Sequence, residues 1–457
     1  MTNQTIRGEF RYKDKNYPFI LENRILTLVG AAFCFREDFQ EEEYLGTLMG
    51  VTDTNQYVFL LDCHILNFAF LTLSGRIQMG LHGYILQDSS DDQFDCVEFY
   101  SPALRAFYSP RKAWSPEIDD TDNTIDMKGI TLNPYETVIQ EIPVTVSGEA
   151  FCCELGFARY FNLHPENRYA LSIQTGLILD FQTQKSSDDL GKYYLYVRDF
   201  LAFINFKRDI PFDDIVLWRR DAEGKRHKSG KAVIFQVNDI EYQPKADNSI
   251  TFDDLGKESF AKLFREIAEQ RLSGEYNPYF LPRGKSETRT VEKSRWLMAA
   301  ISFEGEFNKK YGSLKADRDE QFYHAKEKLL LTIDEAVKES GCSINNKKNK
   351  YFQRFRHLID CYDTTIEEKF HFCEEHFQSE IEQLKSKYCR FNQVSVQTDF
   401  AVKYAESRNR SAHGVVEAIR PEDVVTFQML RCFIYLLVME RASVPSEKRK
   451  EIIKKLF

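Results

Sequence analysis

Residues 281–289 read LPRGKSETR and separate two parts of the chain that differ in texture. The stretch is polar and contains both proline and glycine, which is typical of a linker. Before it, short runs rich in Val, Ile, Tyr and Phe alternate with turn residues, and after it apolar residues recur at helical spacing. We therefore predict a multidomain α+β protein, with a β-rich, sandwich-like domain over residues 1–285 and an all-α helical bundle over residues 290–457.

The composition of the 457-residue chain is that of a globular protein. It contains 37 Phe and 23 Tyr, and 43% of its residues are hydrophobic, which excludes a disordered or collagen-like chain. The N-terminal MTNQTIRGEF has no positive stretch followed by an apolar run, so we predict no secretory signal. The longest apolar run, residues 432–439, is far shorter than the ~20 residues that cross a bilayer. We expect a cytoplasmic protein without a membrane partner.

Charge is distributed unevenly along the chain. Residues 286–457 hold 30 Lys and Arg against 27 Asp and Glu, whereas residues 1–285 hold 31 against 43. The overall net charge of −9 argues against broad, non-specific coating of nucleic acid. A local RNA site in the mildly basic C-terminal part is compatible with this distribution.

Short β-rich runs bounded by Gly, Asp, Asn and Ser predict the strands of the first domain. The runs are residues 57–61, 68–73, 143–147, 169–181, 192–197, 215–218 and 231–237. A helix is expected near 256–271. A sandwich or an open barrel would accommodate these strands, and one possible division into two halves falls near residues 125–145.

The second domain shows helical periodicity. Apolar residues spaced by three and four between Ile366 and Tyr388 predict one helix of about six turns. Acidic residues begin another helix over 317–340, and Gly341 is placed to end it. Pro421 is expected at the first position of a further helix. Because residues 429–439 are apolar nearly all round, this helix should be the buried centre of a bundle.

The cysteines and common motifs indicate neither a metal nor a cofactor. The ten cysteines contain no Cys-x-x-Cys pair, and the nearest approach to ligand spacing is His371-x-Cys373-x-x-His376. Structural zinc takes four ligands, and no second pair follows at comparable spacing. The chain also lacks GxxxxGK[ST], GxGxxG after a strand, HExxH and GxSxG, which argues against nucleotide hydrolysis, dinucleotide redox chemistry and zinc proteolysis.

One polar segment of the helical part, SRNRSAHG at residues 407–414, contains an arginine and a histidine separated by four residues. It closes a helical stretch that we expect to begin near Val394. Similar separations of four to six residues occur elsewhere, so spacing alone does not choose among them. The other pairs are Arg76/His82, Arg159/His164, Arg220/His227 and Arg318/His324.

Context favours Arg408 and His413. Asn409 directly follows the arginine, Gly414 directly follows the histidine, and helices enclose the segment. Here the chain resembles the HEPN ribonuclease superfamily, and within it the ApeA-like group of bacterial anti-phage proteins. The resemblance extends to residues 296–311 (WLMAAISFEGEFNKKY) and to the C-terminal end from residue 419. It implies a β-rich N-terminal domain followed by a helical nuclease domain.

The geometry of an ideal helix limits how the motif residues can meet. Asn409 and His413 are four residues apart and share one face. Arg408 lies about 140° from His413 around the axis, so the two converge if the helix ends near His413, as Gly414 at the C′ position favours. A histidine in the last turn is also favoured in its protonated form by the helix dipole. Arg410, three residues before His413, competes for the role of the arginine.

The resemblance implies an endoribonuclease that needs no metal. His413 would act as general base on the RNA 2′-OH or as acid at the leaving oxygen, Arg408 would hold the scissile phosphate, and Asn409 would orient the phosphate or the imidazole. The products would carry 2′,3′-cyclic phosphate ends. An upstream carboxylate, Glu304 or Glu306, could support the motif, and the sequence does not decide between them.

The resemblance also implies an assembly and a biological role. Two protomers would bring their motifs together, which predicts a homodimer or a larger closed oligomer formed through the helical domain. The acidic N-terminal domain would sense a phage-derived trigger and restrain a toxic nuclease, as in abortive infection.

Two alternative functions come from other classes. A helical bundle with an Arg and a His can be a non-catalytic dimerisation or binding module, antitoxin-like or a scaffold, with the histidine as a helix cap. The sandwich-like texture of the first domain suggests carbohydrate processing, with Asp213-Asp214 and Asp253-Asp254 as acidic pairs. We expect these two pairs to be turn or cap residues instead.

Overall fold

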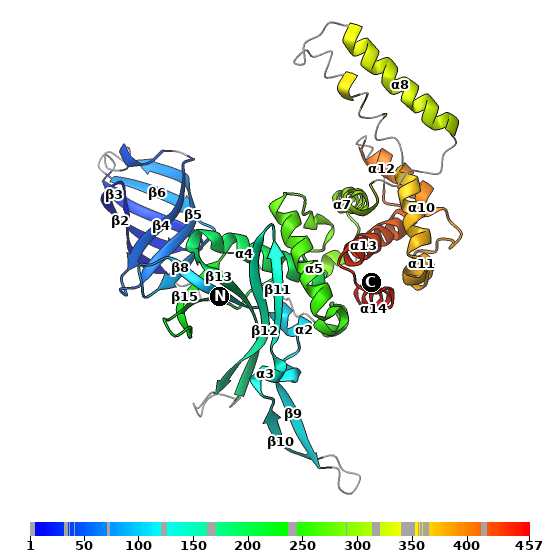
Figure 1. The fold of residues 1–457 in the computed structure, drawn as a ribbon. Helices are drawn as coiled ribbons and strands as arrows, with labels where there is room; N and C mark the ends of the chain where they lie inside the picture. The colour runs from blue at the N-terminus through cyan, green and yellow to red at the C-terminus, as the bar shows by residue number, and fades with distance from the viewer. Residues whose placement is uncertain are drawn as a thin grey trace. The chain divides into compact units, whose positions relative to one another are not determined.

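The computed structural model divides the chain into two compact units, Met1–Lys285 and Ser286–Phe457. The first is rich in strands and the second is helical, which confirms the predicted α+β class (Figure 1). Within the part of the chain that the structure describes, no helix is long and apolar enough to cross a membrane. The described residues are 5–31, 35, 37–40, 42–70, 74–119, 126–161, 171–235, 245–288, 290–312, 320–339, 352–354, 356, 359, 365–412 and 418–457.

The first six strands close into a barrel (Figure 1). They are β1 (Ile6–Tyr12), β2 (Lys15–Glu22), β3 (Ile25–Ala31), β4 (Tyr44–Thr52), β5 (Tyr57–Phe70) and β6 (Ser74–Gly80). Neighbours in the order β5-β4-β1-β2-β3-β6 pair antiparallel, and β6 pairs back onto β5. Alternate side chains of β2, namely Tyr17, Phe19 and Leu21, are buried, which is the period-2 pattern of a strand with one face toward a core.

Two tight turns set the register of the first three strands. Lys13 and Asp14 connect β1 to β2, Asn23 and Arg24 connect β2 to β3, and all four residues have positive φ. Two-residue turns with positive φ at both positions match the right-handed twist of paired strands. They place Phe10 opposite Tyr17, so both rings point into the barrel at a centroid distance of 5.8 Å.

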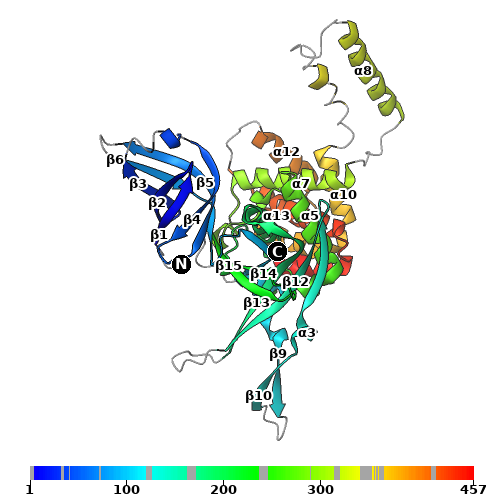
Figure 2. The ribbon, with the colours of Figure 1, turned by 60° about the vertical axis from the view of Figure 1, so that its left-hand side comes forward.

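The sheet continues beyond the barrel as a curved layer of strands. These are β7 (Gly83–Gln87), β8 (Gln93–Tyr100), β11 (Gln140–Val146), β12 (Glu149–Phe161), β13 (Leu171–Ser186), β14 (Asp214–Arg220) and β15 (Arg226–Ile234). Their order is β11-β12-β13-β8-β14-β15-β7, and β7 pairs with β5 of the barrel. A separate hairpin, β9 (Trp114–Asp119) and β10 (Asp126–Leu132), extends away from this layer (Figure 2).

The change from barrel to curved layer falls at residues 81–82, between β6 and β7. The sequence suggested a division near 125–145, but that region instead holds β10, the short helix α3 (Tyr135–Val138) and the start of β11. Barrel closure depends on the pairing of β1 with β4 and of β3 with β6, strands that are not consecutive in the chain, so no local signal reveals it.

Helices cover the layer within the first unit. Besides α3 they are α2 (Pro102–Phe107), α4 (Leu190–Ile204) and α5 (Phe252–Leu272), with short 3₁₀ helices η1 (Pro110–Ala113), η2 (Ser187–Asp189), η3 (Ala246–Asn248) and η4 (Pro278–Phe280). Helix α5 packs on α4 and β11. The Phe200 ring centroid lies 5.5 Å from that of Phe107 and 5.1 Å from that of Phe260, so aromatic contacts join α2, α4 and α5.

The expected strand at residues 192–197 is wrong, because this segment lies inside α4. Its sequence KYYLYV is rich in β-favouring residues, but Tyr193, Tyr194, Tyr196 and Val197 are all buried. A helix buried on most of its surface carries apolar residues without a readable period, so burial in the fold overrides the local preference. The expected strands at 57–61 and 215–218 are confirmed in β5 and β14.

The second unit is built from helices. They are α6 (Lys285–Thr288), α7 (Lys293–Tyr311), α8 (Glu320–Glu339), α10 (Ile366–His376), α11 (Gln378–Asn392), α12 (Phe400–Ala412), α13 (Pro421–Arg441) and α14 (Ser446–Leu456). Pro421 occupies the first turn of α13, as predicted. Every residue from Met429 to Met439 is buried, and α13 packs against α7, α11, α12 and α14, which confirms it as the centre of the bundle.

The apolar stripe from Ile366 to Tyr388 belongs to two helices rather than one. Phe377, with φ −104° and ψ 21°, separates α10 from α11. Its ring is fully buried, so the stripe continues across the break and the periodicity does not reveal it. Helix α12 begins at Phe400 rather than near Val394. Gly341, proposed to end α8, lies outside the described residues.

Candidate active site

The described part of the predicted motif, residues 407–412, lies at the C-terminal end of α12. The Asp399 carboxylate begins this helix by accepting hydrogen bonds from the backbone N–H groups of Ala401 and Val402, each at 3.1 Å. The fully buried side chains of Phe400 and Tyr404 attach the helix to the core. Arg408 and Asn409 therefore sit on a helix that is anchored at its beginning. His413 and Gly414 lie outside the described residues.

Arg408 contacts a carboxylate from another helix. Its Nε donates a hydrogen bond at 3.3 Å to Oε1 of Glu304 on α7, and the Tyr404 hydroxyl donates to the same oxygen at 3.2 Å. The Arg408 side chain remains 33% exposed. Glu304 contacts Nε, and the Nη atoms of a guanidinium can bind a phosphate through two parallel hydrogen bonds. Glu304 thus fixes the arginine without covering it.

Tyr404 supports this contact as a hydrogen-bond donor. Its side chain is fully buried, and burial raises the pKa of the phenol well above its ordinary value. The nearby Glu304 carboxylate raises that pKa further. The hydroxyl therefore stays protonated near neutral pH and donates its hydrogen bond to Glu304 beside Arg408.

The structure separates the two candidate carboxylates. Glu306 bonds to Arg441 on α13, and its Oε1 accepts a hydrogen bond from Lys309 at 3.0 Å. Glu304 and Glu306 are two residues apart, which is about 200° around a helix, so they face different neighbours. Glu304 is the carboxylate beside the motif, a choice that the sequence left open.

The two arginines of the segment also diverge. Arg410 Nη2 donates to the Ser407 hydroxyl at 2.8 Å and lies 3.7 Å from Oδ1 of Asp423. Asp423 itself caps α13, because its other oxygen accepts the backbone N–H of Arg420 at 3.0 Å. Arg410 therefore contacts the start of α13, whereas Arg408 contacts α7. Asn409 lies between them and is exposed.

No family model, curated protein or solved structure matches this chain. The site is therefore defined by the geometry of α7, α12 and α13.

The histidines and cysteine with metal-like spacing do not converge. Cys373 is fully buried in the core, while His376 Nε2 lies 2.8 Å from Oε1 of Glu440. His371 lies 3.5 Å from Asp399. In the described part of the chain, no group of three His, Cys, Asp or Glu side chains is arranged to hold a metal ion.

A second polar cluster in the helical unit gave no sequence signal, because its members come from three helices. The Tyr311 hydroxyl donates to Oε2 of Glu440 at 2.8 Å and lies 3.1 Å from His376 Nε2. Lys310 forms an ion pair with the same carboxylate at 2.8 Å. The His376 ring is stacked on Phe372 with a centroid distance of 5.3 Å. These bonds join α7, α10 and α13, which gives the cluster a structural role.

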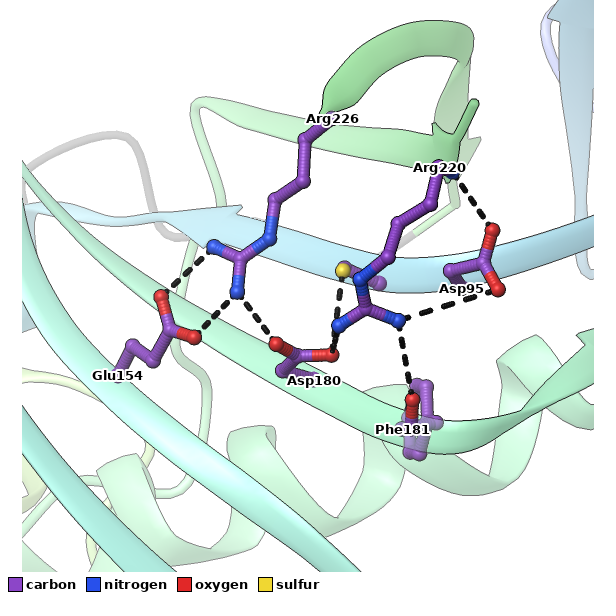
Figure 3. Close-up of polar contacts among 7 residues, drawn as sticks. Asp95, Glu154, Asp180, Phe181, Arg220 and Arg226 are labelled. Atoms are coloured by element: carbon purple, nitrogen blue, oxygen red, sulfur yellow. Dashed lines mark hydrogen bonds and ion pairs between the residues drawn. The ribbon is translucent and has the colours of Figure 1, made fainter. Parts of the chain in front are cut away.

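Charged residues also gather on the curved layer, where Figure 3 shows two arginines among three carboxylates. Arg226 reaches Glu154 through both Nη atoms and also contacts Asp180. Arg220 contacts Asp180 as well, and its backbone N–H donates to Asp95 at 2.7 Å. The network joins strands β8, β12, β13, β14 and β15, and each carboxylate has a donor, so we assign it to stability of the sheet.

The acidic pairs considered for carbohydrate chemistry form ion pairs and hydrogen bonds with other residues of the first unit. Asp213 forms an ion pair with Arg105 at 2.6 Å, and Asp253 forms one with Lys112 at 2.8 Å. Asp254 accepts the backbone N–H of Thr251 at 2.7 Å and caps α5. Asp214 contacts Lys231. Neither pair presents two carboxylates facing one space, as glycoside hydrolysis needs.

One competing Arg/His pair within the described residues, Arg220/His227, does not form a site. Arg220 contacts Asp180, whereas His227 Nε2 lies 2.6 Å from Oδ2 of Asp221. Each side chain has its own carboxylate, and the two do not share a partner.

Proposed function

We propose that this protein is a metal-independent endoribonuclease of the HEPN type. The observation that carries the proposal is the Arg408 guanidinium, held through Nε by Glu304 at the end of α12 and still one-third exposed. A fixed, exposed guanidinium at this position is what phosphate binding requires. The resemblance of residues 296–311 and 407–414 to HEPN proteins supplies the reaction class.

The proposed cleavage uses the nucleophile of the RNA itself. The 2′-OH attacks the adjacent phosphorus, its proton passes to a base, and the bond from phosphorus to the 5′-oxygen breaks as that oxygen takes up a proton. His413 serves as the base or the acid, and Arg408 stabilises the charge that builds on the phosphate oxygens. Asn409 orients the phosphate or the imidazole. One fragment ends in a 2′,3′-cyclic phosphate.

One histidine per chain does not readily supply both proton transfers. We therefore place two motifs together in a homodimer or a larger closed oligomer formed through the helical unit. Closed symmetry is the usual arrangement of identical subunits and would bring two copies of α12 into one composite site.

The N-terminal unit is proposed to control the nuclease. An unrestrained ribonuclease is toxic to its own cell, so a cytoplasmic defence protein of the abortive-infection type needs a trigger. We assign the response to a phage-derived trigger to the β-rich unit, by analogy with the architecture that the sequence resembles.

The test is cleavage of single-stranded or loop RNA by the full-length protein in EDTA. We expect cleavage, with 2′,3′-cyclic phosphate or 3′-phosphate ends identified by mass spectrometry. Arg408→Ala should abolish it, and Arg390→Ala, at an exposed position on α11, should not. Activity that disappears on chelation and returns with magnesium would contradict the mechanism.

A non-catalytic binding module is the second candidate, favoured by the same ion pair. Arg408 already has a carboxylate partner, and such pairs are common structural contacts between helices. This alternative predicts that the protein binds RNA or a protein partner but does not cleave RNA in the assay described above.

A further inference from the structure

A cavity of about 450 Å³ lies in the N-terminal unit. His82 lines it from the junction of the barrel and the curved layer, Tyr194 and Arg198 line it from α4, and Arg271 lines it from the end of α5. Small molecules bind in cavities of roughly 300–1,000 Å³. All the lining residues lie in the first unit, and none of them takes part in the proposed cleavage.

Three arginines line this cavity, and each packs beside a tyrosine ring. The guanidinium carbon and ring centroid are 5.9 Å apart in Arg198–Tyr194, 5.4 Å in Arg208–Tyr279 and 4.8 Å in Arg271–Tyr276. Packing against an aromatic face orients a guanidinium and leaves its edge available for an anion. The cavity wall therefore combines cationic edges with flat aromatic surfaces.

The arginines are held in place by carboxylates that do not cancel their charge. Asp199 is only 2% exposed and bonds to Arg271 and, at 2.7 Å, to Arg198, which satisfies its buried charge. Arg208 Nε lies 3.7 Å from Oδ1 of Asp209, beyond hydrogen-bond distance. Three guanidinium groups thus face two carboxylates, and Arg208 is the least tightly held of the three.

Neutral groups complete the wall. The His82 ring lies edge-on to Tyr194 at a centroid distance of 6.1 Å, and burial lowers the pKa of its imidazole. It is therefore uncharged near neutral pH and can both donate and accept a hydrogen bond. Tyr279 is 55% exposed, so its ring can lie against a ligand at the edge of the cavity.

We propose that this cavity binds a nucleotide. The phosphate would contact Arg208 and the Nη atoms of Arg198 and Arg271 that Asp199 does not bind, and the base would stack on a tyrosine. An inorganic anion would make no contact with the tyrosine rings. An uncharged aromatic ligand would not neutralise the net positive charge of the arginines and carboxylates. The volume suits one small molecule rather than a segment of a macromolecule.

Calorimetric titration of the full-length protein with AMP, GMP, CMP and UMP tests the proposal. We expect at least one of them to bind with a Kd below about 100 μM, and its nucleoside and inorganic phosphate to bind at least about tenfold more weakly. Failure of all four to bind at about 1 mM, or equal binding of inorganic phosphate alone, would overturn it.

Matched variants locate the bound nucleotide. Arg208→Ala and Tyr279→Ala should each weaken binding about tenfold, which corresponds to about 1.4 kcal/mol. Arg265→Ala, at an exposed position on α5, should leave binding unchanged, and so should Arg408→Ala, which separates this cavity from the proposed cleavage site. Because Tyr279 is exposed, we expect Tyr279→Ala to fold. The melting temperatures of Arg208→Ala and Tyr279→Ala show whether both variants are folded. Unchanged binding in both cavity variants would contradict the proposal.

Discussion

At the scale of single residues, Glu304 and Glu306 show how two neighbouring carboxylates on α7 acquire different roles. Glu304 contacts Arg408 with its side chain 22% exposed, whereas Glu306 contacts Arg441 with its side chain 10% exposed. An exposed pair contributes about 0–1 kcal/mol to stability, but removing one partner of a buried pair costs about 3–5 kcal/mol. The two positions therefore form a matched test.

We predict that Glu304→Gln lowers the RNA cleavage rate at least about tenfold, because Arg408 loses its anchor, and that it changes the free energy of unfolding by no more than about 1 kcal/mol. Glu306→Gln should lower the melting temperature and leave the rate per folded molecule unchanged. Cleavage rates and thermal unfolding of both variants supply the comparison. Equal cleavage rates in the two variants would remove Glu304 from the site.

Glu440 gives a prediction about acid stability. Burial alone would raise the pKa of its carboxyl, but hydrogen bonds from Lys310, His376 and Tyr311 outweigh burial and lower it below the ordinary 4.5. A group with a lowered folded-state pKa adds stability above its unfolded pKa, and this stability is lost as the pH falls through the folded value. Glu440→Gln should therefore narrow the difference in melting temperature between about pH 6 and about pH 3.

The control for this prediction is Glu451→Gln, because Glu451 is exposed on α14. It should keep the pH dependence of the wild type. If Glu440→Gln also keeps that dependence, the Glu440 cluster does not contribute to acid unfolding.

The sequence could predict candidate site residues only in part. Arg408 and Asn409 follow from their place in the 407–414 segment, and the structure places them on the last turns of α12. The choice of Glu304 over Glu306 requires knowing which face of α7 meets α12, and one sequence does not contain that information. The approach of His413 to Arg408 stays a prediction.

At the scale of elements, the predictions from sequence are correct where a helix or strand is determined by residues close together in the chain. Pro421 began a helix and the apolar residues after it were buried, because both signals act within a few turns. The sequence of residues 192–197 predicts a strand where the structure has a helix, because burial of Tyr193, Tyr194 and Tyr196 inside the fold hides the helical period. The break at Phe377 was missed for a similar reason, since its buried ring continues the apolar stripe.

Substitution by alanine should change the free energy of unfolding in opposite directions at Gly256 and Gly191. Gly256 lies at a kink in α5 with φ 69° and ψ 177°, a conformation that only glycine adopts without strain. Gly191 lies in the first turn of α4, and a Cβ there would meet nothing within 4 Å. Gly256→Ala should destabilise the protein by about 1–3 kcal/mol, and Gly191→Ala should stabilise it by up to about 1 kcal/mol.

Denaturant unfolding monitored by circular dichroism measures both changes in free energy. Equal effects of the two substitutions would mean that the α5 kink does not depend on the backbone of Gly256.

At the scale of the whole molecule, the fold class was predictable and the strand topology was not. The change from short β-rich runs to helical periodicity predicted the α+β class, because binary patterning follows secondary structure locally. Closure of the barrel depends on pairings between strands that are not consecutive in the chain, such as Gly8 with Thr52 across β1 and β4 and Ile25 with Gly80 across β3 and β6. Many strand orders are compatible with the same alternating patterns, so the sequence could not distinguish a sandwich from a barrel.

The proposed composite site predicts concentration-dependent activity. If two protomers share each site, the full-length protein should sediment as a dimer or a larger closed oligomer. The cleavage rate per chain should fall on dilution as the oligomer dissociates. Analytical ultracentrifugation and cleavage assays over the same concentration range test this, and a monomer that cleaves RNA at the full rate would contradict a shared site.

The most direct test of the nuclease assignment compares the RNA cleavage rate and melting temperature of His413→Ala with those of the wild type, in EDTA. We predict that cleavage is abolished while the melting temperature changes little, because the role proposed for His413 is proton transfer in the reaction and not stability of the bundle. Cleavage at near the wild-type rate, or cleavage lost only because the protein unfolds, would contradict it.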